Sequence, residues 1–346
     1  MSRRTRTLAI GLAVVLLVGI LAGTVRVPLV ALGPGPTFDT LGAVDGKPVV
    51  NVTGRPTYPT TGHLNMTTVA VTDGLTAVTA LQFWGDPDHE VVPRSVVYPA
   101  GKTDQQVDQE NTRQFTDSEN DAEVAALTFL KQPVKVVVGD LSPDAPARGV
   151  LRTGDQLLSV KGTQITSPAQ VTQILTTTRP GEHVPVSYLR GGGPATDGTV
   201  TVGARPPVSG RPDGPQGFLG ITPEGRPADP GQIVISLGDI GGPSAGLAFS
   251  LAVIDKLTPG DLTGGRFVAG TGEITQTGAV GPIGGIALKM IAARRAGATV
   301  FLVPAANCEE AAQDPPAGLR LIRVGTVTDA VNGLTALNEG RVPTGC

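Results

Sequence analysis

The stretch LGDIGGPSAGLAF, residues 237–249, sets Ser244 among four glycines and a proline, directly before an apolar run that is typical of a helix. Glycine and proline are costly in such a turn unless the backbone must adopt unusual angles or approach another group closely. Two interpretations are open from this stretch alone. Ser244 is an ordinary N-cap of the helix, or its hydroxyl is presented for chemistry.

The segment around this turn, from Phe218 to the end of the chain, alternates predicted strands and helices. The strand GQIVISLGDI enters the turn and the helix SAGLAFSLAVIDKL leaves it. A β-rich stretch, a helix ended by Gly297, two further strands and a terminal helix at about 326–338 follow. This order predicts an α/β (α+β) domain over residues 218–346.

The first residues differ in composition from the rest of the chain. Three arginines, Arg3, Arg4 and Arg6, precede the uncharged run Leu8–Val25, whose 18 residues would span roughly 27 Å as a helix. We expect residues 1–26 to be a cytoplasmic basic tip and transmembrane anchor with the body outside the membrane. A cleaved signal peptide is the alternative.

Composition narrows the class of protein. The net charge of −3 and the 3% of aromatic residues give no basic or base-stacking surface for nucleic acid. The 47 glycines and 30 prolines predict many turns, and VSGRPDGPQG at 208–217 is interpreted as a linker. The two cysteines, Cys308 and Cys346, are either bridged in an extracytoplasmic chain or two unrelated thiols.

Two further regions precede that linker. Residues 27–132 are predicted to be β-rich, and GHLNMTTVAV within them is a candidate donor of strands to the C-terminal domain. Residues 133–207 contain strand-like PVKVVVGDL, the turn and strand GDQLLSVKG, and a helix capped by Ser167 with Pro168 at its first position.

The order of elements in 133–207 resembles a PDZ domain of the bacterial protease-associated type. Such domains bind extended peptides or C-termini by adding a strand to a sheet edge. No carboxylate-binding loop is assigned ahead of Val134. GFLGI at 217–221 has the right appearance, but it follows the expected domain and is alternatively a strand of the next one.

A second chemically notable residue lies 45 positions after Ser244. Lys289 stands beside an apolar stripe of Ile286, Met290 and Ala293 on a predicted helix. An isolated lysine in that position usually extends to water, and otherwise it is desolvated for a purpose.

The pair Ser244 and Lys289 resembles the Ser-Lys dyad of the Lon proteases, which have a glycine-proline-serine-alanine-glycine turn and a lysine at the same separation. The motifs between and after them occur in the Lon order: LTGG at 262–265, AGTGEIT at 269–275, GAVGPIGGI at 278–286, AARRAGA at 292–298 and VPAANCEEA at 303–311. With the anchor and the PDZ-like segment, the whole chain resembles the membrane-anchored Lon-like PDZ proteases of Gram-positive bacteria, a group whose N-terminal region GPGPTFDTLG and GHLNMTTV also resemble.

This resemblance implies roles for particular residues. Ser244 would be the nucleophile and Lys289 the general base, neutral through desolvation. Thr271 would hold the lysine ammonium. The backbone of the turn would stabilise the oxyanion, with candidate residues Gly242, Pro243, Ser244 and Ala245. Lon proteases usually carry an acidic residue where this chain has Gly241, and Asp239 is the nearby candidate to replace it.

Other chemistries find little support. His63, His89 and His183 lie outside the Lon-like region, and no metal cluster or cofactor motif is present. YPAGKT at 98–103 mimics the end of a phosphate-binding loop, but Val96 stands where its first glycine belongs.

The sequence therefore predicts an ATP-independent serine endopeptidase that cuts unfolded or tail-exposed proteins at the outer face of the cytoplasmic membrane. Its expected partners are such substrates, peptide termini bound by the PDZ domain, the membrane, and, by resemblance, further copies of itself in a hexamer. The alternative is an inactive Lon-like PDZ scaffold that binds peptide tails of surface proteins.

Overall fold

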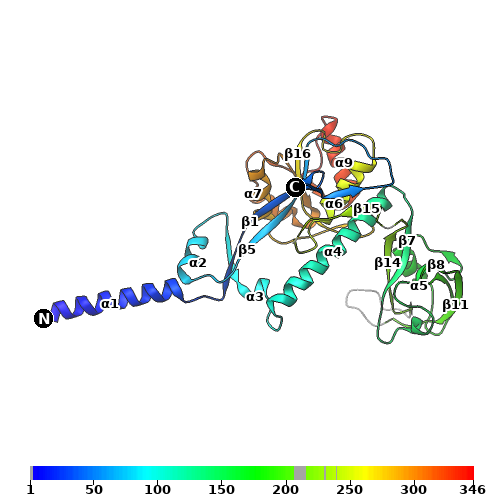
Figure 1. Cartoon of the computed structure of the whole chain (residues 1–346), viewed down its shortest axis with the longest axis horizontal. Coiled ribbons are helices and arrows are strands. Elements are labelled where there is room, and N and C mark those ends of the chain that lie inside the picture. Colours follow the sequence, from blue (N-terminus) through cyan, green and yellow to red (C-terminus); the bar gives the residue numbers. More distant parts are fainter. Residues whose placement is uncertain (1–2, 206–215, 230, 239) are drawn as a thin grey trace.

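The structure, a computed structural model, describes residues 3–205, 216–229, 231–238 and 240–346. Helix α1 (Arg3–Thr24) projects away from the body, and a sheet-rich lobe lies beside the C-terminal end of the long helix α4 (Asp104–Phe129) (Figure 1). No residue of α1 is buried. It is long and apolar enough to cross a membrane, and a signal sequence would have the same properties.

Strands from both ends of the chain form one six-stranded sheet in the order β20-β19-β16-β5-β1-β6. Strands β20, β19, β16 and β5 are parallel neighbours, and β1 runs antiparallel to β5 and β6. The GHLNMTTVAV segment forms β5 and lies in the middle of this sheet, directly beside β16. The strands are β1 (Leu29–Asp39), β5 (His63–Thr72), β6 (Glu90–Pro93), β16 (Phe267–Gly270), β19 (Val300–Pro304) and β20 (Arg320–Val324).

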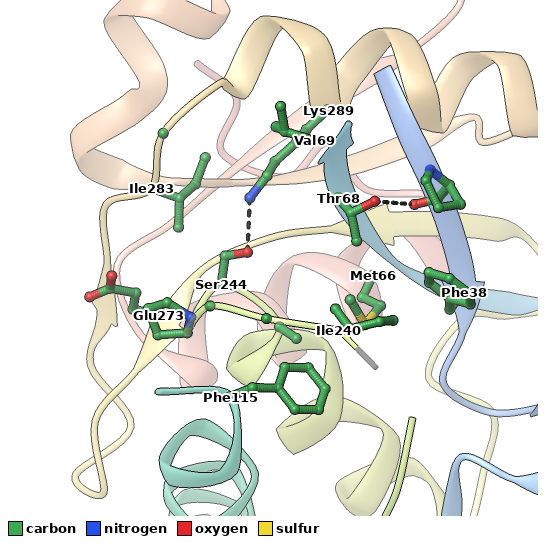
Figure 2. Close-up of a pocket in the computed structure, with 16 residues that line it drawn as sticks. Phe38, Met66, Thr68, Val69, Phe115, Ile240, Ser244, Glu273, Ile283 and Lys289 are labelled. Carbon is green, nitrogen blue, oxygen red and sulfur yellow. Dashed lines mark hydrogen bonds between the residues drawn. The ribbon is translucent and has the colours of Figure 1, made fainter. Parts of the chain in front are cut away.

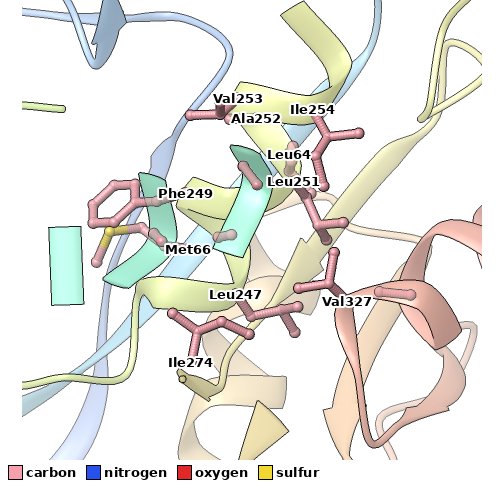
Figure 3. Close-up of a cluster of buried hydrophobic side chains, with 14 of the residues drawn as sticks. Leu64, Met66, Leu247, Phe249, Leu251, Ala252, Val253, Ile254, Ile274 and Val327 are labelled. Atoms are coloured by element: carbon pink, nitrogen blue, oxygen red, sulfur yellow. The ribbon is translucent and has the colours of Figure 1, made fainter. Parts of the chain in front are cut away.

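Both faces of this sheet are covered by helices. Alternate side chains of a strand point to opposite faces, so Val268 and Leu302 join the core beneath α4, α6 (Gly246–Leu257) and α9 (Val327–Asn338). Ala269 and Phe301 instead pack against α7 (Ile286–Ala296) on the other face. Figure 3 shows the first core, in which Leu251 of α6 lies beside Leu64 of β5, and Phe249 of α6 lies beside Met66 of β5.

The PDZ-like lobe has a second sheet, in the order β11-β10-β8-β7-β14, and its own core with α5 (Pro168–Thr176). Its strands are β7 (Val134–Leu141), β8 (Gln156–Val160), β10 (His183–Leu189), β11 (Ala195–Thr201) and β14 (Ile221–Pro227). Among the lobe's ionic contacts, the guanidinium of Arg190 donates to both carboxylate oxygens of the buried Asp155.

The lobe corrects the domain boundaries expected from the sequence. The catalytic domain was expected to begin at 218, after a linker at 208–217. Instead Leu219 is fully buried in the PDZ core, and β14 pairs with β7 along its whole length, from Ile221 opposite Leu141 to Pro227 opposite Val134. The PDZ lobe therefore extends to about residue 227. Residues 208–215 of the expected linker lie outside the described part of the chain.

Short elements connect these units. Cys308 and Cys346 are joined in a disulfide, which is the bridged alternative left open by the sequence.

The remaining elements are β2 (Ala43–Val44), β3 (Lys47–Pro48), β4 (Val50–Val52), α2 (Ala77–Trp84), α3 (Arg94–Val97), a 3₁₀ turn (Pro146–Gly149), β9 (Thr163–Gln164), β12 (Gly203–Ala204), β13 (Gly217–Phe218), β15 (Ile233–Ile235), β17 (Glu273–Ile274), β18 (Val280–Gly281), a second 3₁₀ turn (Ala305–Asn307) and α8 (Cys308–Ala311).

The corrected boundary predicts which PDZ fragment folds. A fragment of residues 133–228 retains β14 and Leu219 and should give cooperative thermal unfolding. A fragment of residues 133–207 lacks β14, so the edge of β7 is unpaired, and it also lacks the buried Leu219. These losses should exceed the free energy of unfolding that a domain of this size has. Circular dichroism and amide NMR dispersion compare the two. A shorter fragment that folds as stably as the longer one would contradict the boundary.

Candidate active site

Ser244 lies in the turn between β15 and α6. Gly242 adopts a φ of +89°, a left-handed conformation that favours glycine, and Pro243 then fixes the approach to Ser244. α6 begins two residues later, at Gly246. A Cβ at Gly246 would lie 2.5 Å from Ile274 and 2.9 Å from Ser118, so only glycine lets the helix start this close to its neighbours. The turn thus places the serine hydroxyl at the N-terminal end of a buried helix.

Helix α4 is hydrogen-bonded to this turn and supports it. The backbone N–H of Gly242 donates to the carbonyl oxygen of Asn111 at 2.9 Å, and Ser118 Oγ donates to the carbonyl oxygen of Pro243 at 3.0 Å. A Cβ at Gly241 would lie 2.8 Å from Cβ of Asn111. The departure from the expected acidic residue at Gly241 therefore has a steric reason, because α4 occupies the space a side chain would need. Asp239 lies outside the described residues.

Lys289 of α7 reaches Ser244 from the opposite side. Its side chain is almost wholly buried, with the residue 4% exposed, and Nζ donates to Ser244 Oγ at 2.9 Å (Figure 2). Nζ also donates to Thr271 Oγ1 at 3.1 Å. Thr271 directly follows β16 and is fully buried. Its hydroxyl in turn donates to the carbonyl oxygen of Ser244 at 3.1 Å. Three residues that the sequence singled out are thus in one hydrogen-bonded group.

The environment favours the neutral form of this lysine. Burial lowers the pKa of Lys289 to about 8, against an ordinary 10.5, and the carboxylate of Glu273 opposes that change. The two groups that accept from Nζ are hydroxyls rather than carboxylates. A sizeable fraction of the amine is therefore unprotonated in mildly alkaline solution.

The hydroxyl of Ser244 opens into a cavity of about 560 Å³. One wall is apolar, and Figure 2 shows Phe38, Met66, Phe115 and Ile240 on the side away from Glu273. A second cavity of about 680 Å³ along α4 shares Phe115, Ile240 and Gly241 with the first. The two cavities therefore adjoin each other, between α4 and the residues that precede the turn, and together are called the cleft below.

The backbone amides around Ser244 are not equivalent. The N–H of Gly242 already donates to Asn111, and Pro243 has no N–H, so the expectation that these two residues contribute to an oxyanion site is wrong. The backbone N–H groups of Ser244 and Ala245 have no hydrogen-bond acceptor among the described residues. These two amides, at the start of α6, are the remaining candidates.

Several residues near the candidate site are not indicated by the sequence. Asn111 and Ser118 lie far upstream of the turn, and nothing in their local sequence indicates that they support it. Glu273 was visible only as part of a motif. The three histidines lie elsewhere, where ring nitrogens of His63, His89 and His183 are hydrogen-bonded to Asp39, Asp86 and Thr201 respectively. In the described part of the chain, no cluster of three or more acidic, histidine or cysteine side chains could hold a metal ion.

A second candidate site lies on the PDZ lobe, where β14 is an edge strand near α5. The GFLGI segment runs from β13 into β14, with Gly220 at a φ of +75°, so it precedes the edge strand as a carboxylate-binding loop would. The side chain of Gln276, from the turn between β17 and β18, accepts from the N–H of Gly225 and donates to Asp121 Oδ1 at 2.8 Å. Part of the β14 edge is thereby occupied by the hairpin of β17 and β18.

Comparison with known proteins finds a proteolytic domain and a PDZ domain in this chain, although the PDZ match begins within α4 and ends before β14. Residues 238–335 match the Lon protease (S16) C-terminal proteolytic domain and residues 108–200 match a PDZ domain. A Lon protease from Campylobacter concisus is 41% identical over 100 residues, and one from Roseiflexus castenholzii is 46% identical over 74. These alignments cover 28% and 21% of this chain but only 12% and 9% of the relatives' length.

The solved structures that this chain resembles include isolated PDZ domains. The PDZ domain of the SdrC-like protein from Listeria monocytogenes is 22% identical, with 25% of this chain and 85% of that chain covered and a TM-score of 0.22. The corresponding domain from Listeria innocua is 20% identical, with 26% and 92% covered and a TM-score of 0.22.

The buried lysine predicts a pH-dependent stability. Between about pH 8 and 10.5 the unfolded chain binds a proton that folded Lys289 has lost, so the free energy of unfolding of the wild type rises with pH relative to Lys289→Met. The gain should approach about 3 kcal/mol over that range. Thermal or urea unfolding of both proteins at about pH 7 and pH 10 measures it. Ser244→Ala retains the lysine and should retain the pH effect, whereas a constant difference between wild type and Lys289→Met would refute it.

Proposed function

We propose that this chain, which carries a Lon-type proteolytic domain and a PDZ domain, is a serine endopeptidase with Ser244 as nucleophile and Lys289 as general base. The observation that carries the proposal is the 2.9 Å hydrogen bond between Ser244 Oγ and a buried amine whose pKa burial lowers to about 8. A serine hydroxyl needs an adjacent base to become nucleophilic, and a lysine serves as one only when it is neutral.

The chemistry follows from this arrangement. Neutral Lys289 takes the hydroxyl proton while Ser244 Oγ forms a bond to the carbonyl carbon of the substrate. The backbone N–H groups of Ser244 and Ala245 stabilise the negative oxygen, aided by the N-terminal end of α6. The lysine ammonium, kept in place by Thr271, then protonates the leaving amine as the peptide bond breaks. Water attacks the resulting ester with Lys289 again as base, which releases the second product.

The cleft indicates which substrates are accepted. Its apolar wall of Phe38, Met66, Phe115 and Ile240 suits an apolar side chain next to the scissile bond, and Glu273 on the opposite side disfavours an acidic one. A peptide must also be extended to pass along α4. Folded proteins present few such segments, so the proposed substrates are unfolded or tail-exposed proteins.

The other units complete the proposal. The sequence contains no phosphate-binding loop of the required spacing, so the peptidase would act without ATP. α1 would anchor it in the membrane with the arginines on the cytoplasmic side. The edge of β14 beside α5 would bind peptide termini, and assembly into a ring of copies remains a proposal based on resemblance alone.

The dyad predicts a distinctive set of mutant activities on a fluorogenic peptide with an apolar residue before the scissile bond. Ser244→Ala and Lys289→Ala should each lose at least about 10³-fold in kcat/KM. Lys289→Arg should lose as much, because arginine is not deprotonated in proteins. Wild-type activity should rise as pH increases through about 8, as the amine loses its proton.

Lys256→Arg is a matched control. Lys256 is half-buried, and burial lowers its pKa as it lowers that of Lys289, but Nζ donates to the carbonyl oxygen of Leu41 away from the cleft. This variant should retain most of the activity. Substantial activity of Lys289→Arg would refute the general-base role. A serine-directed covalent probe separates the scaffold alternative. An active peptidase should be labelled in the wild type but not in Ser244→Ala, whereas an inactive scaffold should show no difference between the two.

The anchor predicts where the body lies. Protease added to intact protoplasts should degrade residues 27–346, and a cytoplasmic marker should survive. A body that resists until the protoplasts are lysed would contradict the orientation. The mass of the chain extracted from membranes distinguishes an uncleaved anchor from a cleaved signal peptide, because cleavage would shorten the chain by about the length of α1.

A further inference from the structure

Helix α2 (Ala77–Trp84) presents an apolar face to solvent. Val78, Leu81 and Trp84 follow one another at intervals of three residues and are 40%, 64% and 76% exposed. That spacing keeps the three side chains on one side of the helix. Exposed large apolar side chains gathered in this way mark a surface that contacts something other than water.

The orientation of this face is fixed by the other side of the helix. Ala80 is buried against Ala31 and Leu75, and Phe83 packs on the same cluster. A capping box at Thr76 and Thr79 fixes the first turn. The helix therefore cannot roll over to bury Trp84 in its own body.

α2 also lies where α1 leaves the body. The backbone N–H of Val27 donates to the carbonyl oxygen of Leu75 at 2.8 Å, and Arg26 pairs with Thr76 in an antiparallel bridge. Figure 1 shows α2 beside the C-terminal end of α1. The apolar surface of α1 continues to Val25, which is 53% exposed, and the two helices are in contact.

Several acidic side chains near α2 have partners within the protein. Asp86 contacts a ring nitrogen of His89 at 2.9 Å, and Arg94 bridges Asp73 and Asp104. Asp88 forms an ion pair with Arg295. Carboxylates with partners repel an anionic surface less than free ones, so these acidic residues do not prevent close approach to lipid headgroups.

We propose that α2 is an interfacial helix that lays Val78, Leu81 and Trp84 into the outer surface of the bilayer that α1 spans. This inference rests on the proposed anchor. Tryptophan and leucine on one helix face suit the boundary between headgroups and acyl chains, and α1 already holds α2 at that depth. Three side chains expose far less area than the roughly 1,200 Å² of a stable protein interface, which argues against a second copy as the occupant.

The chain offers a direct probe, because Trp84 is its only tryptophan. The full chain is reconstituted into vesicles of phosphatidylcholine and phosphatidylglycerol, and vesicle flotation measures anchoring independently. Parallel samples contain lipids brominated near the headgroup end or near the methyl end of the acyl chain. Insertion to a depth of about 5–10 Å predicts a blue-shifted emission, strong quenching by the shallow bromines, weaker quenching by the deep ones and protection from acrylamide.

A pair of neighbouring variants makes the test specific. Leu81→Asp should restore access of acrylamide to Trp84 and remove quenching by bromolipid, whereas Gln82→Ala, at an exposed polar neighbour, should change neither. Both should still float and hydrolyse peptide like the wild type.

The outcomes separate this inference from the anchor. A chain that fails to float overturns the anchor and the insertion together. A chain that floats with Trp84 open to acrylamide and unaffected by bromolipid overturns the insertion alone. Protection from acrylamide without bromolipid quenching, increasing with protein density, would assign the face to a second copy and equally overturn the proposal.

Discussion

The contact between Lys289 Nζ and Ser244 Oγ sets the main constraint on this structure. An amine can act as a base near neutral pH only if it is kept from water and from carboxylates that would hold its proton. α7 therefore buries Lys289 against the sheet, and Thr271 supplies a hydroxyl rather than a charge. The serine must meet this amine from the other face, which requires the tight turn and its support by α4.

The sequence predicts those residues of the candidate site that are local or have a characteristic spacing. Ser244, Lys289 and Thr271 stand in motifs, and the structure brings them within hydrogen-bonding distance. The sequence does not predict the support given by Asn111 and Ser118, because contacts between segments so far apart leave no periodic signal. It also wrongly indicates Gly242 as an oxyanion donor, since only coordinates show that its N–H is already used. In the fold, β14 was assigned to the wrong domain because a strand's composition does not reveal its partner.

The two candidate sites are physically joined by one hairpin. β17 carries Glu273, which lines the cleft, and the turn that follows carries Gln276. The side-chain oxygen of Gln276 accepts a hydrogen bond from the backbone N–H of Gly225, in the edge strand β14. Side-chain amides can replace backbone partners at a sheet edge, and here one does so between lobes. The PDZ lobe is consequently positioned by this hairpin, as well as tethered to the main body through α4 and the segment before β15.

The insertion of this lobe also bears on the order in which the chain folds. Ser118 and Pro243, which meet beneath Ser244, are separated by 125 positions, and contacts of that kind form slowly because a long loop must close first. Val134 and Pro227, at the two ends of the PDZ lobe, are direct partners in its sheet. Once the lobe has folded around its own local core, the intervening loop is already closed, and only short segments remain to be brought together. The geometry of the peptidase site is thus favoured to form late, after most of the chain has become compact.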